Sequence, residues 1–229
     1  MLPEHLYMTD LGKIAYVALY LPLALVLLWL LYRMCFRKVA LSWLWTAVSA
    51  LVLLTLPFWD VYMIGRDAER LCREEGGLHV YKVVEADSFR GGGNIVKLSE
   101  YGFAYAEAIG LGGKIYRRKV KDGKLIRNVI DDFTTQHSIG GRGYQVITSS
   151  ISSNALQTVD LETGEILGDL VSLNIHPGRF DGLLLRLVGS GPVVWHCGGE
   201  PPIGRTEPLG FDDLILATLK PKQGKGATQ

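Results

Sequence analysis

Two long runs of hydrophobic residues dominate the first quarter of the chain. Residues 14–32 (IAYVALYLPLALVLLWLLY) and residues 39–59 (VALSWLWTAVSALVLLTLPFW) contain no charged side chain over nineteen and twenty-one positions. At 1.5 Å per residue in a helix, each run is long enough to cross a hydrocarbon core of about 30 Å. Buried helices of globular proteins usually have a polar stripe and shorter apolar runs. The pattern therefore predicts a transmembrane helical hairpin at residues 14–59, preceded by an N-terminal tail at residues 1–13.

The residues that connect these two runs predict the orientation of the hairpin. The connection at residues 33–38 contains Arg33, Arg37 and Lys38 and no acidic residue, whereas the tail before it contains one lysine and two carboxylates. Basic residues in short loops are retained on the cytoplasmic side of a membrane. We therefore expect a bacterial inner-membrane protein with both termini in the periplasm. A cleaved signal peptide is not expected, because no small-residue cleavage site follows the first run and a second run begins after six residues.

After residue 59 the pattern changes to that of a polar domain with short strands. Twenty-six of the 27 glycines lie here, among many valine, isoleucine and tyrosine residues, which favours strands joined by tight turns. Residues 60–75 are expected to continue the second membrane helix until Gly76-Gly77 ends it. A helix is expected at residues 211–219, and an Asp-Gly pair at residues 122–123 predicts a β-hairpin. Strands are expected at residues 78–86, 94–98, 114–120, 124–130, 144–150, 155–161, 166–173 and 183–188.

Together these patterns predict a membrane-anchored α+β protein. A two-helix transmembrane hairpin is followed by a mainly antiparallel β domain at residues 60–219 and by a polar tail at residues 220–229. We expect the β domain to be exported, because it follows the second membrane helix and the expected orientation places that end of the hairpin in the periplasm.

Charge narrows the classes of partner. The chain has 24 basic and 23 acidic residues and a net charge of +1 at pH 7, which argues against a protein that binds nucleic acid by electrostatics. The densest positive run contains Arg117, Arg118, Lys119 and Lys121. It has two interpretations: a solvated strand edge that resists aggregation, or a contact with anionic headgroups or an acidic partner.

The three cysteines predict a disulfide bond. Cys35 lies in the connection that we expect in the cytoplasm, whereas Cys72 and Cys197 lie in the expected periplasmic domain, where disulfides form. Two alternatives are a pair of buried free thiols and a metal site completed by His79 or His196. The metal site is disfavoured, because zinc ligands usually come in closely spaced pairs.

The search for catalytic residues yields one weak candidate. His137 follows Asp131 and Asp132 closely, an arrangement that suits either an acid–base cluster or an ordinary polar loop. The chain has no P-loop, no nucleophile elbow and no helical histidine pair for zinc. The sequence therefore predicts no catalytic residue, no metal site and no cofactor, and it favours a non-enzymatic role.

A short motif after the second apolar run adds a resemblance. Cys72, Gly76, Gly77 and Tyr81 form a Cys-x-x-x-Gly-Gly-x-x-x-Tyr segment. This segment resembles a pattern in uncharacterised proteobacterial inner-membrane proteins. The resemblance covers about ten residues and implies a location, without implying an activity.

The expected function is that of a membrane-tethered periplasmic interaction module. Its expected partners are the lipid bilayer and another envelope protein, without nucleic acid. An accessory subunit of a secretion or pilus system, or an immunity protein against an envelope-acting toxin, would fit. The alternative is a periplasm-facing hydrolase with a site around Asp131, Asp132 and His137. Transport is disfavoured, because neither apolar run contains an ionisable acidic or basic residue to line a pathway.

Overall fold

The computed structural model describes residues 7–37, 41–191, 193–199 and 207–222. The chain divides into two compact units. Unit 1 contains Met1–Leu71, Ile147–Ser152 and Asn174–Trp195, and unit 2 contains Cys72–Val146, Ser153–Leu173 and His196–Gln229. The chain therefore returns twice to the unit that holds the apolar helices, which the sequence pattern did not predict. Residues 1–6 of the predicted N-terminal tail and residues 223–229 of the predicted polar tail lie outside the described residues.

The first apolar run of unit 1 forms one long helix with two wider turns. It consists of α1 (Asp10–Ala15), the π-helical turn η1 (Tyr16–Tyr20), α2 (Leu21–Leu31) and the π-helical turn η2 (Tyr32–Phe36). The turn η1 ends just before Pro22, whose ring nitrogen has no hydrogen to donate to the helix ladder. The helix thus continues into the predicted connection at residues 33–38, of which Lys38 lies outside the described residues.

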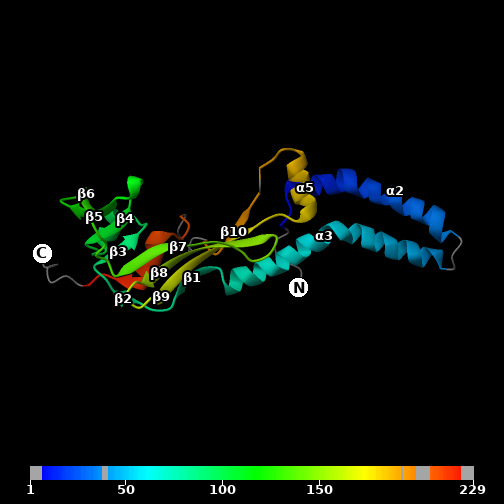
Figure 1. Cartoon of the computed structure of the whole chain (residues 1–229). Helices are drawn as coiled ribbons and strands as arrows, with labels where there is room; N and C mark the ends of the chain where they lie inside the picture. Colours follow the sequence, from blue (N-terminus) through cyan, green and yellow to red (C-terminus); the bar gives the residue numbers. More distant parts are fainter. Residues whose placement is uncertain (1–6, 38–40, 192, 200–206, 223–229) are drawn as a thin grey trace. The chain divides into compact units, whose positions relative to one another are not determined.

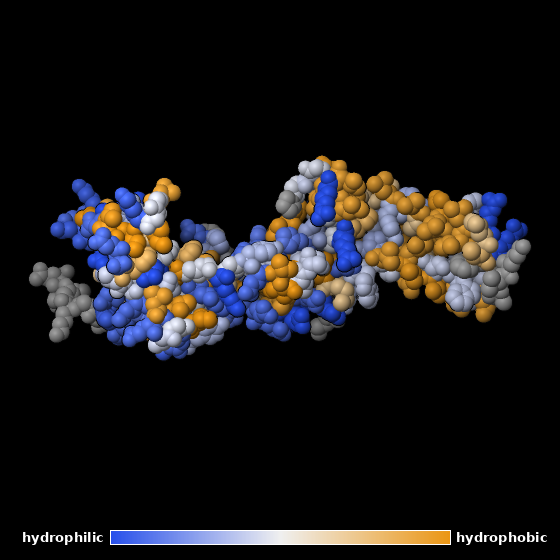
Figure 2. All heavy atoms as spheres, viewed as in Figure 1, coloured by the Kyte–Doolittle hydropathy of each residue, from blue (hydrophilic) through white to orange (hydrophobic). Residues whose placement is uncertain are grey.

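The second apolar run forms α3 (Ser42–Glu74), which lies beside the first helix (Figure 1). The hydroxyl groups of Tyr16 and Tyr20 donate hydrogen bonds of 3.1 and 2.6 Å to backbone carbonyls of α3. Both helices are long and apolar enough to cross a membrane. Figure 2 shows hydrophobic side chains covering the surface of this pair. As predicted, α3 continues beyond the apolar run and ends before Gly76-Gly77, where Gly77 has a φ of 107° that favours glycine.

A further helix, α5 (Arg179–Leu187), belongs to unit 1. The strand predicted at residues 183–188 is therefore wrong. A short run such as Leu-Leu-Leu-Arg-Leu does not distinguish a strand from a helix by periodicity alone. In the structure, the buried residues Asp181 and Leu185 are four positions apart, which is the spacing of one helical turn.

Two carboxylates fix α5 to the apolar helices. Asp60 in α3 accepts a hydrogen bond of 2.6 Å from the backbone N–H of Arg179. Asp181 is fully buried and accepts two hydrogen bonds of 2.6 Å from Thr9, one from its N–H and one from its hydroxyl. The Thr9 hydroxyl oxygen also accepts a hydrogen bond from the Gly12 N–H and so caps α1. We call Thr9 and Asp181 the aspartate clasp. A side chain at Gly12 would place its Cβ only 2.5 Å from Asp181 Oδ1, so the aspartate clasp requires glycine at position 12.

Unit 2 is built around a mostly antiparallel, mixed sheet, in partial agreement with the predicted β domain. The strand order is β1-β9-β8-β7-β3-β4-β5-β6, and β10 pairs with β9. Strand β3 is parallel to both β4 and β7, whereas the β1–β9, β4–β5 and β5–β6 pairs are antiparallel. A separate parallel pair joins β2 to β11.

The strands are β1 (Gly77–Val80), β2 (Val84–Glu85), β3 (Ser88–Gly91), β4 (Tyr105–Ile109), β5 (Ile115–Lys121), β6 (Lys124–Ile130), β7 (His137–Val146), β8 (Ile151–Asp160), β9 (Ile166–Ile175), β10 (Trp195–Cys197) and β11 (Leu219–Lys220).

The hydrophobic core of unit 2 lies between this sheet and two helices. Helices α4 (Ile95–Glu100) and α6 (Phe211–Thr218) contribute Leu98, Leu214 and Ile215, all without exposed surface. These side chains belong to one buried cluster with residues of β3, β4, β7 and β9. A short 3₁₀ turn, η3 (Leu111–Gly113), connects β4 to β5.

The structure confirms some of the predicted elements of unit 2 and corrects others. The β5–β6 hairpin and the helix at residues 211–219 are confirmed within one or two residues. The strand predicted at residues 94–98 is wrong, because Asn94 caps helix α4 by accepting a hydrogen bond from the Val96 N–H. The strand predicted at residues 78–86 is interrupted after β1, where Tyr81 and Lys82 both donate to the Leu167 carbonyl.

The predicted disulfide bond is present in unit 2. It joins Cys72, near the end of α3, to Cys197 at the end of β10, with the two Cα atoms 5.9 Å apart. Cys35 in unit 1 is a free and exposed thiol. The alternatives of two free thiols or a Cys72–Cys197 metal site are thereby excluded. Among the residues that the structure describes, no cluster of three or more histidine, cysteine or carboxylate side chains is placed to hold a metal ion.

Candidate functional site

The most distinctive surface of unit 2 is a hairpin rich in basic residues. We call residues 114–130 the basic hairpin; they include β5, β6 and the turn between them. The turn residues Asp122 and Gly123 both have positive φ values, 53° and 71°, as expected for the two-residue turn that Asp-Gly predicts. Strand β6 stands at the end of the strand order, so the basic hairpin forms an edge of the sheet.

Positive charge is concentrated in the basic hairpin to an unusual degree. It carries seven lysine and arginine side chains and the single carboxylate of Asp122, a net charge of +6. Because the whole chain has a net charge of +1, the other residues together carry −5. The pairing register also sets like charges opposite each other, with Arg118 facing Arg127 and Lys121 facing Lys124. Like charges in such cross-strand pairs destabilise a sheet, so stability alone does not account for this arrangement.

One face of the basic hairpin mixes these cations with exposed apolar side chains. Side chains alternate between the two faces of a strand, so the cross-strand pairs Tyr116–Val129 and Val120–Leu125 lie on the same face as Arg118 and Arg127. Val129 and Leu125 are both exposed. Arginine and tyrosine beside aliphatic side chains are the composition typical of protein–protein interfaces.

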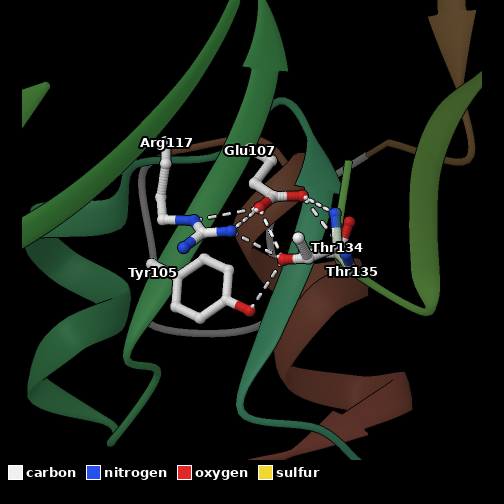
Figure 3. Close-up of polar contacts among 5 residues, drawn as sticks. All are labelled: Tyr105, Glu107, Arg117, Thr134 and Thr135. Atoms are coloured by element: carbon white, nitrogen blue, oxygen red, sulfur yellow. Dashed lines mark hydrogen bonds and ion pairs between the residues drawn. The ribbon is translucent and has the colours of Figure 1, made fainter. Parts of the chain in front are cut away.

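A buried carboxylate holds the base of the basic hairpin. Glu107 in β4 has no exposed surface, and its carboxylate accepts hydrogen bonds from Nε and Nη2 of Arg117 at 3.0 and 2.8 Å (Figure 3). It also accepts from the Thr134 N–H and hydroxyl, both at 2.9 Å, and from the Thr135 N–H at 3.2 Å. The guanidinium of Arg117 lies over the Tyr105 ring, 4.6 Å from its centre. We call Glu107, Arg117 and Thr134 the glutamate clasp.

The glutamate clasp is suited to holding the structure together and not to moving protons. Burial alone would raise the pKa of Glu107, but the hydrogen bonds from Thr134, Arg117 and Thr135 outweigh burial and lower the pKa below its ordinary value. The group therefore stays ionised, and both of its oxygens are engaged by donors. The clasp ties the segment after β6 back onto β4 and β5 and so fixes the base of the basic hairpin.

Two further arginines give the surface near the clasp its positive charge. The guanidinium of Arg90 in β3 lies 3.6 Å from the centre of the Phe133 ring. Arg118 donates to the Gly91 carbonyl at 3.1 Å, and burial together with the nearby Arg127 lowers the pKa of its guanidinium. A negatively charged group of a partner beside Arg118 would weaken the repulsion between Arg118 and Arg127.

No protein-family model, curated protein or solved structure matches the chain. The interpretation of this surface therefore depends on its geometry and charge. The resemblance of the Cys72–Tyr81 segment to inner-membrane proteins stays a prediction.

The residues of the predicted polar cluster lie in different environments. Asp131 and Asp132 are exposed in the segment that follows β6, whereas His137 is buried at the start of β7. Burial lowers the pKa of His137, while Asp160 on the neighbouring strand β8 favours its charged form. Among the described residues, neither Asp131 nor Asp132 forms a hydrogen bond or ion pair with His137. The structure thus places His137 beside Asp160, away from solvent.

Sequence reasoning missed Glu107 and Thr134 and assigned Arg117 only to a basic run. One signal was available: Glu107 stands in the sequence Tyr-Ala-Glu-Ala-Ile, between two small apolar residues. A charged residue in such a strand needs a partner of opposite charge or several donors. The sequence does not show which arginine would reach it.

Proposed function

We propose that this chain is a membrane-anchored interaction module of the bacterial envelope, with the basic hairpin as its contact for an acidic surface of another envelope protein. The two apolar helices supply the anchor, because each is long enough to span a bilayer. The Cys72–Cys197 disulfide supports an oxidising compartment, which for a bacterial inner-membrane protein is the periplasm. An accessory subunit of a secretion or pilus system, or an immunity protein, would use such a module.

The observation that carries the proposal is the segregation of charge. A net charge of +6 is concentrated in the basic hairpin, with like charges opposite each other, whereas the other residues of the chain carry −5. A surface with this concentration of positive charge would steer association toward an acidic partner and select against basic ones. A hydrolase that uses His137 receives less support, because that side chain is buried.

Fusions with alkaline phosphatase test the anchor and its orientation. This reporter is active only in the periplasm, so a fusion after Gln229 should be active and a fusion within residues 33–38 should be inactive. The reverse pattern would overturn the orientation that the positive-inside rule predicts.

Charge reversal tests the contact surface. Lys121→Glu with Lys124→Glu changes two exposed, cross-strand neighbours at the tip of the basic hairpin. Lys220→Glu with Lys222→Glu changes the net charge of unit 2 by the same amount at two other exposed positions. A partner that copurifies with the full chain after gentle detergent extraction should be lost with the first pair of substitutions and retained with the second. Equal loss with both pairs would contradict a specific contact through the basic hairpin.

A further inference from the structure

Helix α5 is positioned by the two membrane-length helices of unit 1. Asp60, which holds the N-terminus of α5, directly follows Trp59, the last residue of the second apolar run. The ring of Phe180 in α5 packs edge-to-face on Tyr20 of the first helix, with 5.9 Å between ring centres. Asp60 thus places the start of α5 at the end of the second apolar run, and Phe180 contacts the first apolar run within its length.

An apolar face of α5 is open to solvent in the isolated chain. Leu183, Leu187 and the following Val188 are 57%, 74% and 60% exposed. Figure 2 shows the hydrophobic surface of α5 continuing onto that of the paired apolar helices. A bilayer that covers the helix pair would therefore also cover this face of α5. Short helices whose exposed apolar side chains are flanked by arginines suit the membrane–water interface, where the arginine stems lie along apolar surface and the charged heads reach water.

A cavity with both polar and apolar lining adjoins the same helix within unit 1. Its volume is about 690 Å³, and Arg179 and Arg186 of α5 line it together with Leu183. The two arginines are seven positions apart, so they lie on one side of the helix two turns from each other. Four further polar residues line the cavity: Ser149, Ser150, His176 and Ser190. No carboxylate stands among the described lining residues, so the cavity combines fixed positive charge with hydroxyl donors.

We propose that α5 is an interfacial helix that binds an anionic phospholipid, with the headgroup phosphate in this cavity and an acyl chain along Leu183 and Leu187. Charge complementarity favours this occupant, since guanidinium and hydroxyl groups are the usual donors to a phosphodiester. The apolar part of the lining and its continuity with the exposed leucines favour a lipid over free phosphate. The proposal rests on the membrane anchor proposed above.

The experiment uses fluorescent probes in the full chain after reconstitution into lipid vesicles. A Cys35→Ser background leaves only the disulfide-bonded cysteines, so a single new cysteine can be labelled. Leu187→Cys reports on α5, Leu23→Cys on the first apolar run and Lys119→Cys on the basic hairpin. Phosphatidylcholine with brominated acyl chains should quench the probes at positions 187 and 23 and leave the probe at 119 unquenched.

A second measurement tests the headgroup cavity. Brominated phosphatidylglycerol should quench the probe at position 187 several-fold more strongly than brominated phosphatidylcholine at the same content. Arg179→Gln with Arg186→Gln should remove this preference. Arg66→Gln with Arg70→Gln should retain it, because these exposed arginines of α3 lie in the same unit and do not line the cavity.

The outcomes separate the inference from the proposed function. Quenching at position 23 without quenching at position 187 would overturn the interfacial helix and leave the anchor standing. An unquenched probe at position 23 would overturn the anchor itself. A preference for phosphatidylglycerol that survives Arg179→Gln with Arg186→Gln would overturn the headgroup site.

Discussion

Units 1 and 2 each bury a carboxylate that joins segments distant in the sequence, but they satisfy it in different ways. Asp181 in unit 1 receives its hydrogen bonds from the N–H and hydroxyl of Thr9, at a helix N-terminus where the backbone dipole favours negative charge. Glu107 in unit 2 receives a guanidinium in addition to backbone and hydroxyl donors. Unit 2 thus pairs its buried carboxylate with the full positive charge of a guanidinium. Unit 1 stabilises its buried carboxylate with hydrogen-bond donors and the helix dipole alone.

The two units also differ in the other features that stabilise a fold, and unit 2 again has the stronger ones. Unit 2 encloses a hydrophobic core between a sheet and two helices and carries a disulfide bond. Unit 1 leaves most of the large apolar side chains of its helices exposed, and its described cysteine, Cys35, is a free thiol. Unit 2 has the features of a domain that is stable in water, whereas the stability of unit 1 depends on the environment that covers its apolar surface.

The distribution of tryptophan allows the two units to be measured separately. All five tryptophans lie in unit 1, so their fluorescence reports on that unit alone. Hydrogen exchange of peptides from unit 2 gives the free energy of opening of its strands. Both measurements are made on the full chain in detergent or lipid.

The largest expected effect on stability follows from removing the disulfide bond. The bridge spans a sequence separation of 125 residues, for which chain entropy predicts a stabilisation of about 5 kcal/mol. Cys197→Ser should lower the free energy of opening of unit 2 by up to that amount. Cys72→Ser should have the same effect, and the double substitution should add nothing.

Cys35→Ser is the matched control for the disulfide and should leave both units unchanged. Alkylation of the unreduced protein, followed by mass analysis, should modify Cys35 alone. Modification of Cys72 and Cys197 as free thiols would contradict the bond.

The next largest effect is expected at the glutamate clasp. Arg117→Gln leaves the fully buried Glu107 without its positive partner, which typically costs about 3–5 kcal/mol. Hydrogen exchange in β4 and β5 should show this loss. Arg127→Gln removes an exposed arginine from the neighbouring strand and should be neutral or slightly stabilising, because Arg127 faces Arg118. Equal losses for the two substitutions would show that the clasp does not stabilise unit 2 as a charge pair.

Asp181→Asn tests the corresponding clasp of unit 1. The two Thr9 donors bind different oxygens of the Asp181 carboxylate, and asparagine replaces one of these oxygens with an amino group that cannot accept a hydrogen bond. The expected loss is about 1–3 kcal/mol, measured by tryptophan fluorescence during denaturation. Asp10→Asn, at an exposed position of the same helix start, should have little effect. A loss as large as that of Arg117→Gln would remove the distinction between the two clasps.

The contrast between the units also explains what the sequence could predict. Apolar runs, the Asp-Gly turn and the cysteine count are local signals, and they predicted both apolar helices, the basic hairpin and the disulfide. The partners of Asp181 and Glu107 come from contacts between distant segments, such as Thr9 with Asp181, which no local pattern encodes. The local pattern at residues 183–188 predicts a strand for a related reason: the Asp60 and Asp181 contacts that fix α5 as a helix are absent from the local sequence.

The candidate functional residues show the same difference between local signals and contacts of distant segments. The basic run was visible, but the role of Arg117 in the glutamate clasp was not, because Glu107 lies ten residues earlier on another strand. The grouping of Asp131 and Asp132 with His137 relied on proximity in the sequence. In the structure, strand β7 buries His137 beside Asp160, whereas the two aspartates stay exposed in the preceding segment.

The smallest expected effect concerns the pH dependence of unit 2. Burial lowers the pKa of His137 below its unfolded value of about 6.5, and Asp160 opposes the shift. Between the two pKa values the unfolded chain binds a proton that the folded chain does not. The stability that this group contributes is therefore complete above about pH 6.5 and declines below it.

The variant His137→Gln has no titrating group at this position. Its unit 2 should therefore lose less stability than that of the wild type when the pH falls from about 7 to about 5. The comparison is between slopes measured by hydrogen exchange, corrected for the intrinsic exchange rate at each pH, and therefore holds even if glutamine lowers stability at both pH values. Identical slopes would show that His137 is not held neutral by burial, and the loss of stability of unit 2 at acid pH would then have to come from its carboxylates.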